Sequence, residues 1–192
     1  MKRKNFDKIV TAVGLGLTIF LFLAAALLNW GASFAQDSVK SPLENQNIAF
    51  PAIEGMPAET KDQLAKWAGK SVTTGEMAKD YSDLYIWEHM KGAAIAALGK
   101  PATYSEVSGM YMGLTRSGST DTEQIAKLGE LRQTLFMGNT LRGMLLTAYA
   151  FGTLGVIAGY GAIAALVSAV VMLVLTIAGW IHIRRTPESA TI

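Results

Sequence analysis

The sequence contains no cysteine and only two histidines, His89 and His182, among its 192 residues. Without cysteine, disulfides, thiolate metal sites and cysteine nucleophiles are excluded. Charged residues make up only 17%, and the net charge of +2 is too small to indicate a nucleic-acid-binding protein. These absences remove most chemistry that depends on metals, thiols or imidazole bases, and they direct attention to the apolar residues.

Two long stretches carry no charged side chain, one from Ile9 to Gln36 and the other from Gly143 to Ile183. A helix that crosses the hydrocarbon core of a bilayer needs about 20 apolar residues. The first stretch therefore predicts one crossing, over residues 9–28. The second would form a helix about 62 Å long, roughly twice the thickness of the hydrocarbon core. It holds either two crossings or one, over residues 161–183, with an apolar extension.

Basic residues at both ends of the chain favour two crossings. Several lysines and an arginine lie within residues 1–8, and the pair Arg184–Arg185 follows the second stretch. The positive-inside rule places both of these ends, residues 1–8 and 184–192, in the cytoplasm. Both ends on one side require an even number of crossings, and two is the simplest number.

Two alternatives to this topology stay open. A turn between Gly155 and Gly161 would allow three crossings, although it would export the terminal arginine pair. Ser33–Phe34–Ala35 resembles a signal-peptide cleavage site. The apolar stretch before it is longer than the core of most signal peptides, which favours an uncleaved anchor.

The segment between the crossings, residues 29–142, is predicted to be a helical domain outside the cytoplasm. Its prolines and glycine predict an irregular chain over residues 41–58. Capping-box patterns at 73–76, 103–106 and 120–123 predict three helix starts, and a short helix is expected around 61–68. The first box opens a helix over 76–98, and the second opens one that ends near residue 112. No sustained alternation of apolar and polar residues indicates strands.

The last outer helix has no proline before Pro187 and is expected to continue from Asp121 into the second crossing. The prediction is thus an all-α integral membrane protein with two transmembrane helices, the second long and continuous. It leaves an apolar neck, residues 143–160, that extends about 27 Å beyond the bilayer. Apolar surface on this scale is not tolerated in water.

Three covers for the neck are conceivable. The outer continuation of the first crossing could cover it through Trp30, Phe34, Val39 and Leu43. The 76–98 helix could do so through Met77, Tyr81, Leu84, Tyr85 and Met90. A partner protein is the third cover.

Residues with small side chains form a candidate interaction stripe. Gly155 and Gly159 are four residues apart, as are Ala165 and Ala169, and this spacing lets helix backbones approach closely. The stripe packs against the first crossing, against a partner protein, or against a second copy of the chain. Three large apolar side chains of the neck complete the candidate surface: Leu146, Phe151 and Leu154.

The polar candidates have structural interpretations. His89 is expected to be a partly buried helix residue, and the carboxylates around Asp80 and Asp83 a solvated helix face. Arg142 is expected at the start of the neck, bonded to a carboxylate or to helix carbonyls. No charge lies within either predicted crossing, which disfavours transport. No catalytic residue, cofactor or metal ligand is assigned.

Three segments, Ala68–Tyr81, Thr103–Glu106 and Leu131–Phe136, resemble small actinobacterial membrane proteins with the order crossing, helical outer domain, crossing. Many of those proteins carry the label "aromatic ring-opening dioxygenase". Such ring opening requires iron held by two histidines and a carboxylate. In the two-crossing topology His89 and His182 lie on opposite sides of the membrane, so the resemblance implies the architecture but no activity.

These observations predict a non-catalytic accessory or scaffold subunit of a larger bacterial membrane complex in the plasma membrane, with a respiratory complex as a candidate partner. Membrane lipids would surround the crossings, and self-association is a further expectation. The alternative is a lipid- or quinone-binding membrane protein whose site lies between the neck and the aromatic helix Tyr81 to Trp87.

Overall fold

The computed structural model describes residues 2–191, and the chain divides into two compact units. The first unit comprises Met1–Gln36 and Leu154–Ile192, and the second comprises Asp37–Thr153. Two helices are long and apolar enough to cross a membrane, α1 (Arg3–Asn45) and α6 (Thr122–Arg185). Each of them contributes residues to both units. The all-α prediction and the prediction of a long, continuous last helix are therefore confirmed.

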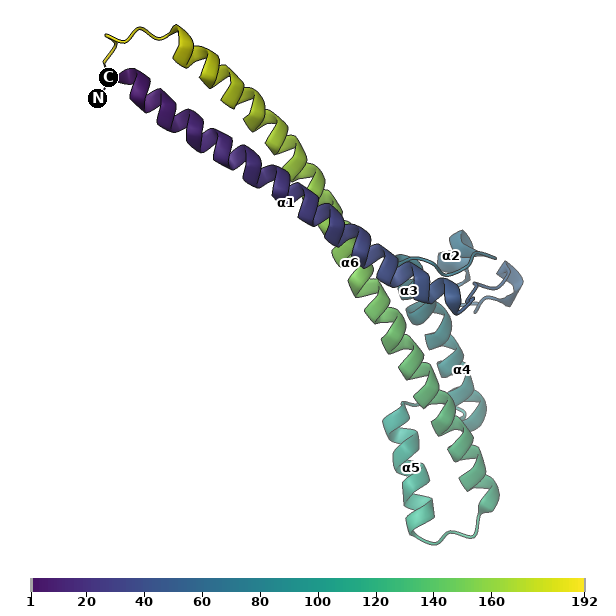
Figure 1. Ribbon diagram of the computed structural model, residues 1–192. Coiled ribbons are helices and arrows are strands. Elements are labelled where there is room, and N and C mark those ends of the chain that lie inside the picture. The colour runs from purple at the N-terminus through teal and green to yellow at the C-terminus, as the bar shows by residue number, and fades with distance from the viewer. Residues whose placement is uncertain (1, 192) are drawn as a thin grey trace. The chain divides into compact units, whose positions relative to one another are not determined.

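The first unit is an antiparallel pair formed by α1 and α6. Gly179 faces Thr11, and Gly161 faces Leu28. Later residues of α1 therefore contact earlier residues of α6, as in any antiparallel pair. Residues close to the two ends of the chain lie together at one end of this pair (Figure 1), where the Arg3 amide donates a hydrogen bond to the Ala190 carbonyl. The two ends of the chain are therefore held together.

Most apolar side chains of this helix pair face outward. In the most apolar part of each long helix only 11% is buried within the protein. Val13, Leu27 and Val167 are 66%, 68% and 59% exposed. A pair of helices has no interior in which these side chains could be hidden, so this surface requires an apolar environment outside the chain.

The second unit packs short helical elements around the early turns of α6 and the last turns of α1. A proline or glycine separates several of them, which keeps the elements short. In chain order they are η1 (Ile53–Gly55), α2 (Lys61–Leu64), η2 (Ala65–Trp67), α3 (Gly75–Asp80), η3 (Tyr81–Ile86), α4 (Trp87–Leu98) and α5 (Tyr104–Arg116). Within residues 2–191 the only extended pairings are isolated bridges, Lys2 with Thr191 and Ala49 with Ser71.

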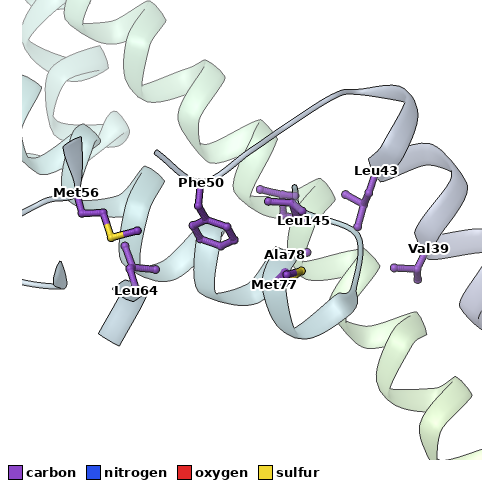
Figure 2. Close-up of a cluster of buried hydrophobic side chains, with 9 residues drawn as sticks. Val39, Leu43, Phe50, Met56, Leu64, Met77, Ala78 and Leu145 are labelled. Carbon is purple, nitrogen blue, oxygen red and sulfur yellow. The ribbon is translucent and has the colours of Figure 1, made fainter. Parts of the chain in front are cut away.

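Two clusters of buried apolar side chains hold this unit together. The first, shown in Figure 2, joins the end of α1, the loop after it, α3 and α6, and Phe50 and Leu64 lie at its centre with 2% and no exposure. The second joins α4, α5 and the beginning of α6 around Ala94, Val107 and Leu135. The long helix α6 is thus common to both clusters.

The end of α1 differs from the prediction of an irregular chain after Ser41. The helix continues to Asn45 and contains Pro42. Pro42 removes one hydrogen bond within the helix, and its ring crowds the carbonyl group one turn earlier, so this position carries a local cost. Val39 and Leu43 point into the first core cluster, and their burial outweighs the local preference.

The predicted helix starts are partly correct. Thr103 and Glu106 form the expected capping box, with the Thr103 amide donating to Glu106 Oε2 at 2.7 Å. In α3 the cap is Thr74, which accepts from the Met77 amide, and Glu76 plays no part in it. At the start of α6 the cap is Asp121 instead of Thr120, and its carboxylate accepts a hydrogen bond from the Gln124 amide. The helix thus begins at Thr122, one residue later than predicted.

The helix predicted over 76–98 is interrupted by a change of winding. Residues Tyr81–Ile86 form a π-helix between the α-helices α3 and α4. The helix ends at Gly99, which adopts a left-handed conformation with φ of 76°, as the glycine there predicts. Helix α5 extends to Arg116, one turn beyond its predicted end.

Candidate functional site

The neck is covered along one face by the continuation of α1. In the second unit, Leu145 is buried in the first core cluster with Val39 and Leu43 (Figure 2). Gly152 lies against Gly75 and Val39, where a methyl group on Gly152 would be 3.2 Å from the Gly75 Cα atom. The first of the three expected covers, the continuation of α1, is therefore present, and so is the second, because Met77, Tyr81 and Leu84 of the expected 76–98 helix pack in the same cluster as Leu145.

In the first unit, α1 packs against the stripe of small residues. A methyl group on Gly155 would be 3.1 Å from the Ala35 Cβ atom, and one on Gly159 would be 3.9 Å from that of Ala32. Ala169 is fully buried, and Ala165 is partly buried. Of the three uses considered for the stripe, packing against the first crossing is the one observed at Gly155 and Gly159.

The side chains expected to provide the cover differ from those observed. Trp30 and Phe34 were expected to lie on the neck, but they are 68% and 58% exposed and stack on each other with ring centroids 5.8 Å apart. The smaller residues Ala32 and Ala35 face α6 instead. Close contact between helices favours small side chains, which leaves the large rings on the outer face.

The other face of the neck is uncovered. Phe151 and Leu154 are 47% and 59% exposed, while Leu146 is partly buried. Ile157 and Tyr160 continue the exposed surface within the first unit. We call Phe151, Leu154, Ile157 and Tyr160 the neck surface. Apart from the Tyr160 hydroxyl, it presents large apolar side-chain surface.

A polar cluster lies at the start of the neck, around Arg142. Its Nε donates to the Ser82 carbonyl at 3.2 Å, and its Nη2 donates to Asp83 Oδ1 at 3.1 Å. The guanidinium also lies over the Trp87 ring, 4.6 Å from the centroid. The prediction that Arg142 bonds to a carboxylate or to helix carbonyls is confirmed, with one acceptor of each kind.

Two carbonyl groups of the π-helix accept hydrogen bonds from side chains outside it. Its wider winding shifts the backbone pairing, so that the Trp87 amide donates to the Ser82 carbonyl. The Leu84 carbonyl accepts from the Thr60 hydroxyl at 2.8 Å. Side chains from α6 and from the residue before α2 thus stabilise the change of winding. The sequence contains no signal for this feature, which depends on tertiary contacts.

The carboxylates of this region form ion pairs and are not the freely solvated face that was expected. Asp83 contacts both Arg142 and Lys79, while Lys66 bridges Asp80 and Glu76. Burial alone would raise the pKa of Asp83, but hydrogen bonds from Arg142 and Lys79 outweigh burial and hold that pKa below its ordinary value. Asp83 is therefore a structural anion.

Aromatic rings form a column along the same face of the second unit. Phe50 stacks with Trp67 and meets the edge of Tyr81, which contacts Tyr85. Burial raises the pKa of Tyr81, so its hydroxyl stays protonated. Because Tyr81 and Tyr85 pack against the first core cluster, this face offers no support for the alternative lipid or quinone site.

His89 ends the aromatic column, against the edge of Tyr85. It is exposed, so the expectation of a partly buried histidine is wrong. His182 belongs to the first unit and lies 3.7 Å from Asp7. Within residues 2–191 no three histidine or carboxylate side chains gather in a way that could hold a metal ion. The arrangement needed for ring-opening chemistry is not found there.

Searches with this chain against protein-family models, curated proteins and solved structures returned no match. The function must therefore be argued from the residues described above.

Proposed function

We propose that the chain is a non-catalytic accessory or scaffold subunit of a larger bacterial membrane complex, which it contacts through the neck surface. The proposal places α1 and α6 across the plasma membrane and the second unit outside the cytoplasm. A respiratory complex remains a candidate partner. The observation that carries the proposal is a row of exposed apolar side chains on the part of α6 that precedes its predicted crossing.

The register of α1 and α6 supports membrane insertion. The two crossings, 9–28 and 161–183, were predicted separately, and Leu28 lies beside Gly161 where one begins and the other ends. Near the opposite boundary Thr11 lies beside Gly179. Because the boundaries of the two predicted crossings lie side by side, both crossings can span the same bilayer. Both ends of the chain then lie on the same side of the membrane.

Aromatic side chains at both boundaries are consistent with this placement. Trp30 and Tyr160 lie just beyond one boundary and are 68% and 71% exposed, while Trp180 lies near the other and is 54% exposed. Tryptophan and tyrosine favour the interface between lipid and water, because their rings are apolar and carry one polar group.

The small-residue stripe and the neck surface have different roles in this proposal. Gly155 and Gly159 join the two helices of one chain, so they are not available to a partner. A partner would instead contact Phe151, Leu154 and Ile157, whose exposed faces are large and apolar. Protein interfaces place such side chains at their centre.

Site-specific photo-crosslinking in native membranes tests this contact. We expect a photoreactive amino acid at Leu154 or Ile157 to give discrete products with another protein. The control positions are Val167, which is 59% exposed within the second predicted crossing, and Thr115, which is exposed on α5. The proposal is wrong if Leu154 and Ile157 give only the lipid adducts expected at Val167, and if the extracted protein is a monomer without partners.

A further inference from the structure

A groove of about 450 Å³ runs between α1 and α6 in the first unit, near the chain termini. Lys8, Thr11 and Leu15 line it from α1, one helical turn apart, and Ala12 lies between them. The opposite wall comes from α6 and consists of Leu173, Thr176, Ile177, Trp180 and Ile183. The groove is apolar along most of its length and has a single charged side chain, Lys8, at the end nearest the termini.

Positive charge dominates around this end of the groove. The side chains of Lys8 and Arg185 form no ion pair among residues 2–191. Arg184 stacks on Trp180, with its guanidinium carbon 3.7 Å from the ring centroid, and so supports one wall of the groove. Two acids lie at the same end: Glu188 pairs with Lys4, and the Asp7 Oδ2 atom lies 3.7 Å from His182 Nε2 without a hydrogen-bond partner among the described residues.

We propose that this groove binds one acyl chain of an anionic phospholipid, with the lipid phosphate beside Lys8. The inference rests on the membrane insertion proposed above but not on docking through the neck surface. Lys8 immediately precedes the first predicted crossing, at the depth where lipid phosphates lie, and the apolar walls continue toward the bilayer centre. A basic side chain at the mouth of an apolar groove complements both parts of such a lipid.

Native mass spectrometry of the full chain in mild detergent tests this site. Phosphatidylglycerol and phosphatidylcholine with identical acyl chains are added at equal concentration. We expect one adduct to be retained, with phosphatidylglycerol favoured. Lys8→Gln should lower phosphatidylglycerol occupancy about fivefold, the change that one basic side chain near an anionic membrane provides. Ala12→Leu should fill the groove and reduce occupancy by both lipids.

Two matched control variants distinguish lipid binding in this groove from nonspecific association of lipid with the helices. Ala26→Leu adds the same bulk to an exposed position of α1 that does not line the groove, and it should leave occupancy unchanged. Arg185→Gln removes a charge at the same end of the unit but outside the groove lining, and it should have less effect than Lys8→Gln. Circular dichroism confirms that each variant keeps its helix content.

The proposal is overturned if both lipids bind equally, if Ala26→Leu acts as strongly as Ala12→Leu, or if Arg185→Gln matches Lys8→Gln. Equal effects of Arg185→Gln and Lys8→Gln would mean that the lipid responds to the total positive charge at this end of the unit and not to Lys8 in particular. Retention of the parent chain in vesicles after alkaline extraction tests insertion separately. A chain that is retained in vesicles but shows no lipid preference contradicts the groove site alone.

Discussion

At the scale of single residues, Gly75 is a position where the backbone of α6 leaves no room for a side chain. A methyl group there would lie 3.1 Å from both the Ala148 carbonyl oxygen and the Tyr149 Cα atom. These are backbone atoms of α6, which cannot move aside as a flexible side chain would. We expect Gly75→Ala to lower the free energy of unfolding by about 1–3 kcal/mol through overpacking.

Gly92→Ala is the matched control for this prediction. Gly92 is exposed in α4, and nothing lies within 4 Å of the methyl group that alanine would add. Alanine is the better helix former, so this variant should gain about 0.5–1 kcal/mol. Both changes can be measured by denaturant unfolding in mild detergent, followed by circular dichroism. If Gly75→Ala and Gly92→Ala change the free energy of unfolding equally, the contact between α3 and α6 at Gly75 leaves room for a methyl group.

At the scale of elements, the π-helix depends on Arg142. We expect Arg142→Ala to destabilise the second unit by about 2 kcal/mol, because Asp83 loses one of its two cationic partners and the Ser82 carbonyl loses the bond from the guanidinium. Arg142→Lys should recover only part of this loss, since an ammonium group lacks the planar fork that reaches both acceptors. Thermal unfolding of the three proteins measures the difference, and full recovery by lysine would contradict the assigned geometry.

The same contact predicts a dependence of stability on pH. The folded state lowers the pKa of Asp83, so this carboxylate adds stability at pH values above its ordinary pKa. That stability is lost as the pH falls through the lowered pKa of the folded state. The stability difference between the parent and Asp83→Asn should therefore shrink on acidification.

Asp37→Asn provides the comparison for this pH dependence. Asp37 is exposed in α1 and has no ion pair among the described residues. Denaturant unfolding at neutral and acidic pH should show a constant, small difference from the parent. If the two variants respond alike to acidification, the ion pair of Asp83 with Arg142 does not contribute to stability.

Elements with a strong local signal could be predicted from the sequence, and those that depend on distant contacts could not. The continuous α6 and the cap at Thr103 follow from apolar run length and from local spacing. The π-helix, by contrast, is stabilised by Thr60 and Arg142, which lie far from it in the chain. The helical segment after Ser41 was missed because burial of Leu43 outweighs the preference of Pro42.

The candidate site was predictable to a similar degree. The exposed positions of Phe151 and Leu154 follow from an apolar run that is longer than one crossing. The face of the neck that α1 covers could not be assigned, because small residues in α1 and in α6 permit several registers. The observed register selects Ala32 and Ala35 as neighbours of the glycines and leaves Trp30 and Phe34 outside.

At the scale of the whole molecule, the proposed topology depends on both ends of the chain lying on one side of the membrane. The Lys4 Nζ atom lies 3.3 Å from Glu188 Oε1, and the Arg3 amide bonds to the Ala190 carbonyl. An antiparallel pair of crossing helices makes this closeness unavoidable. A chain with three crossings would place its ends on opposite faces and could not form either contact.

The absence of cysteine allows this topology to be tested with single-cysteine variants in intact cells. Asn5→Cys and Ser189→Cys place a thiol at each end, and Ser105→Cys places one in α5; all three positions are exposed. We expect a membrane-impermeant maleimide to label only residue 105 until the cells are opened, when all three react. Labelling of residue 189 together with residue 105 in intact cells would mean that the arginine pair is exported. The neck would then form part of an additional crossing, and its apolar side chains would contact lipid instead of a partner protein.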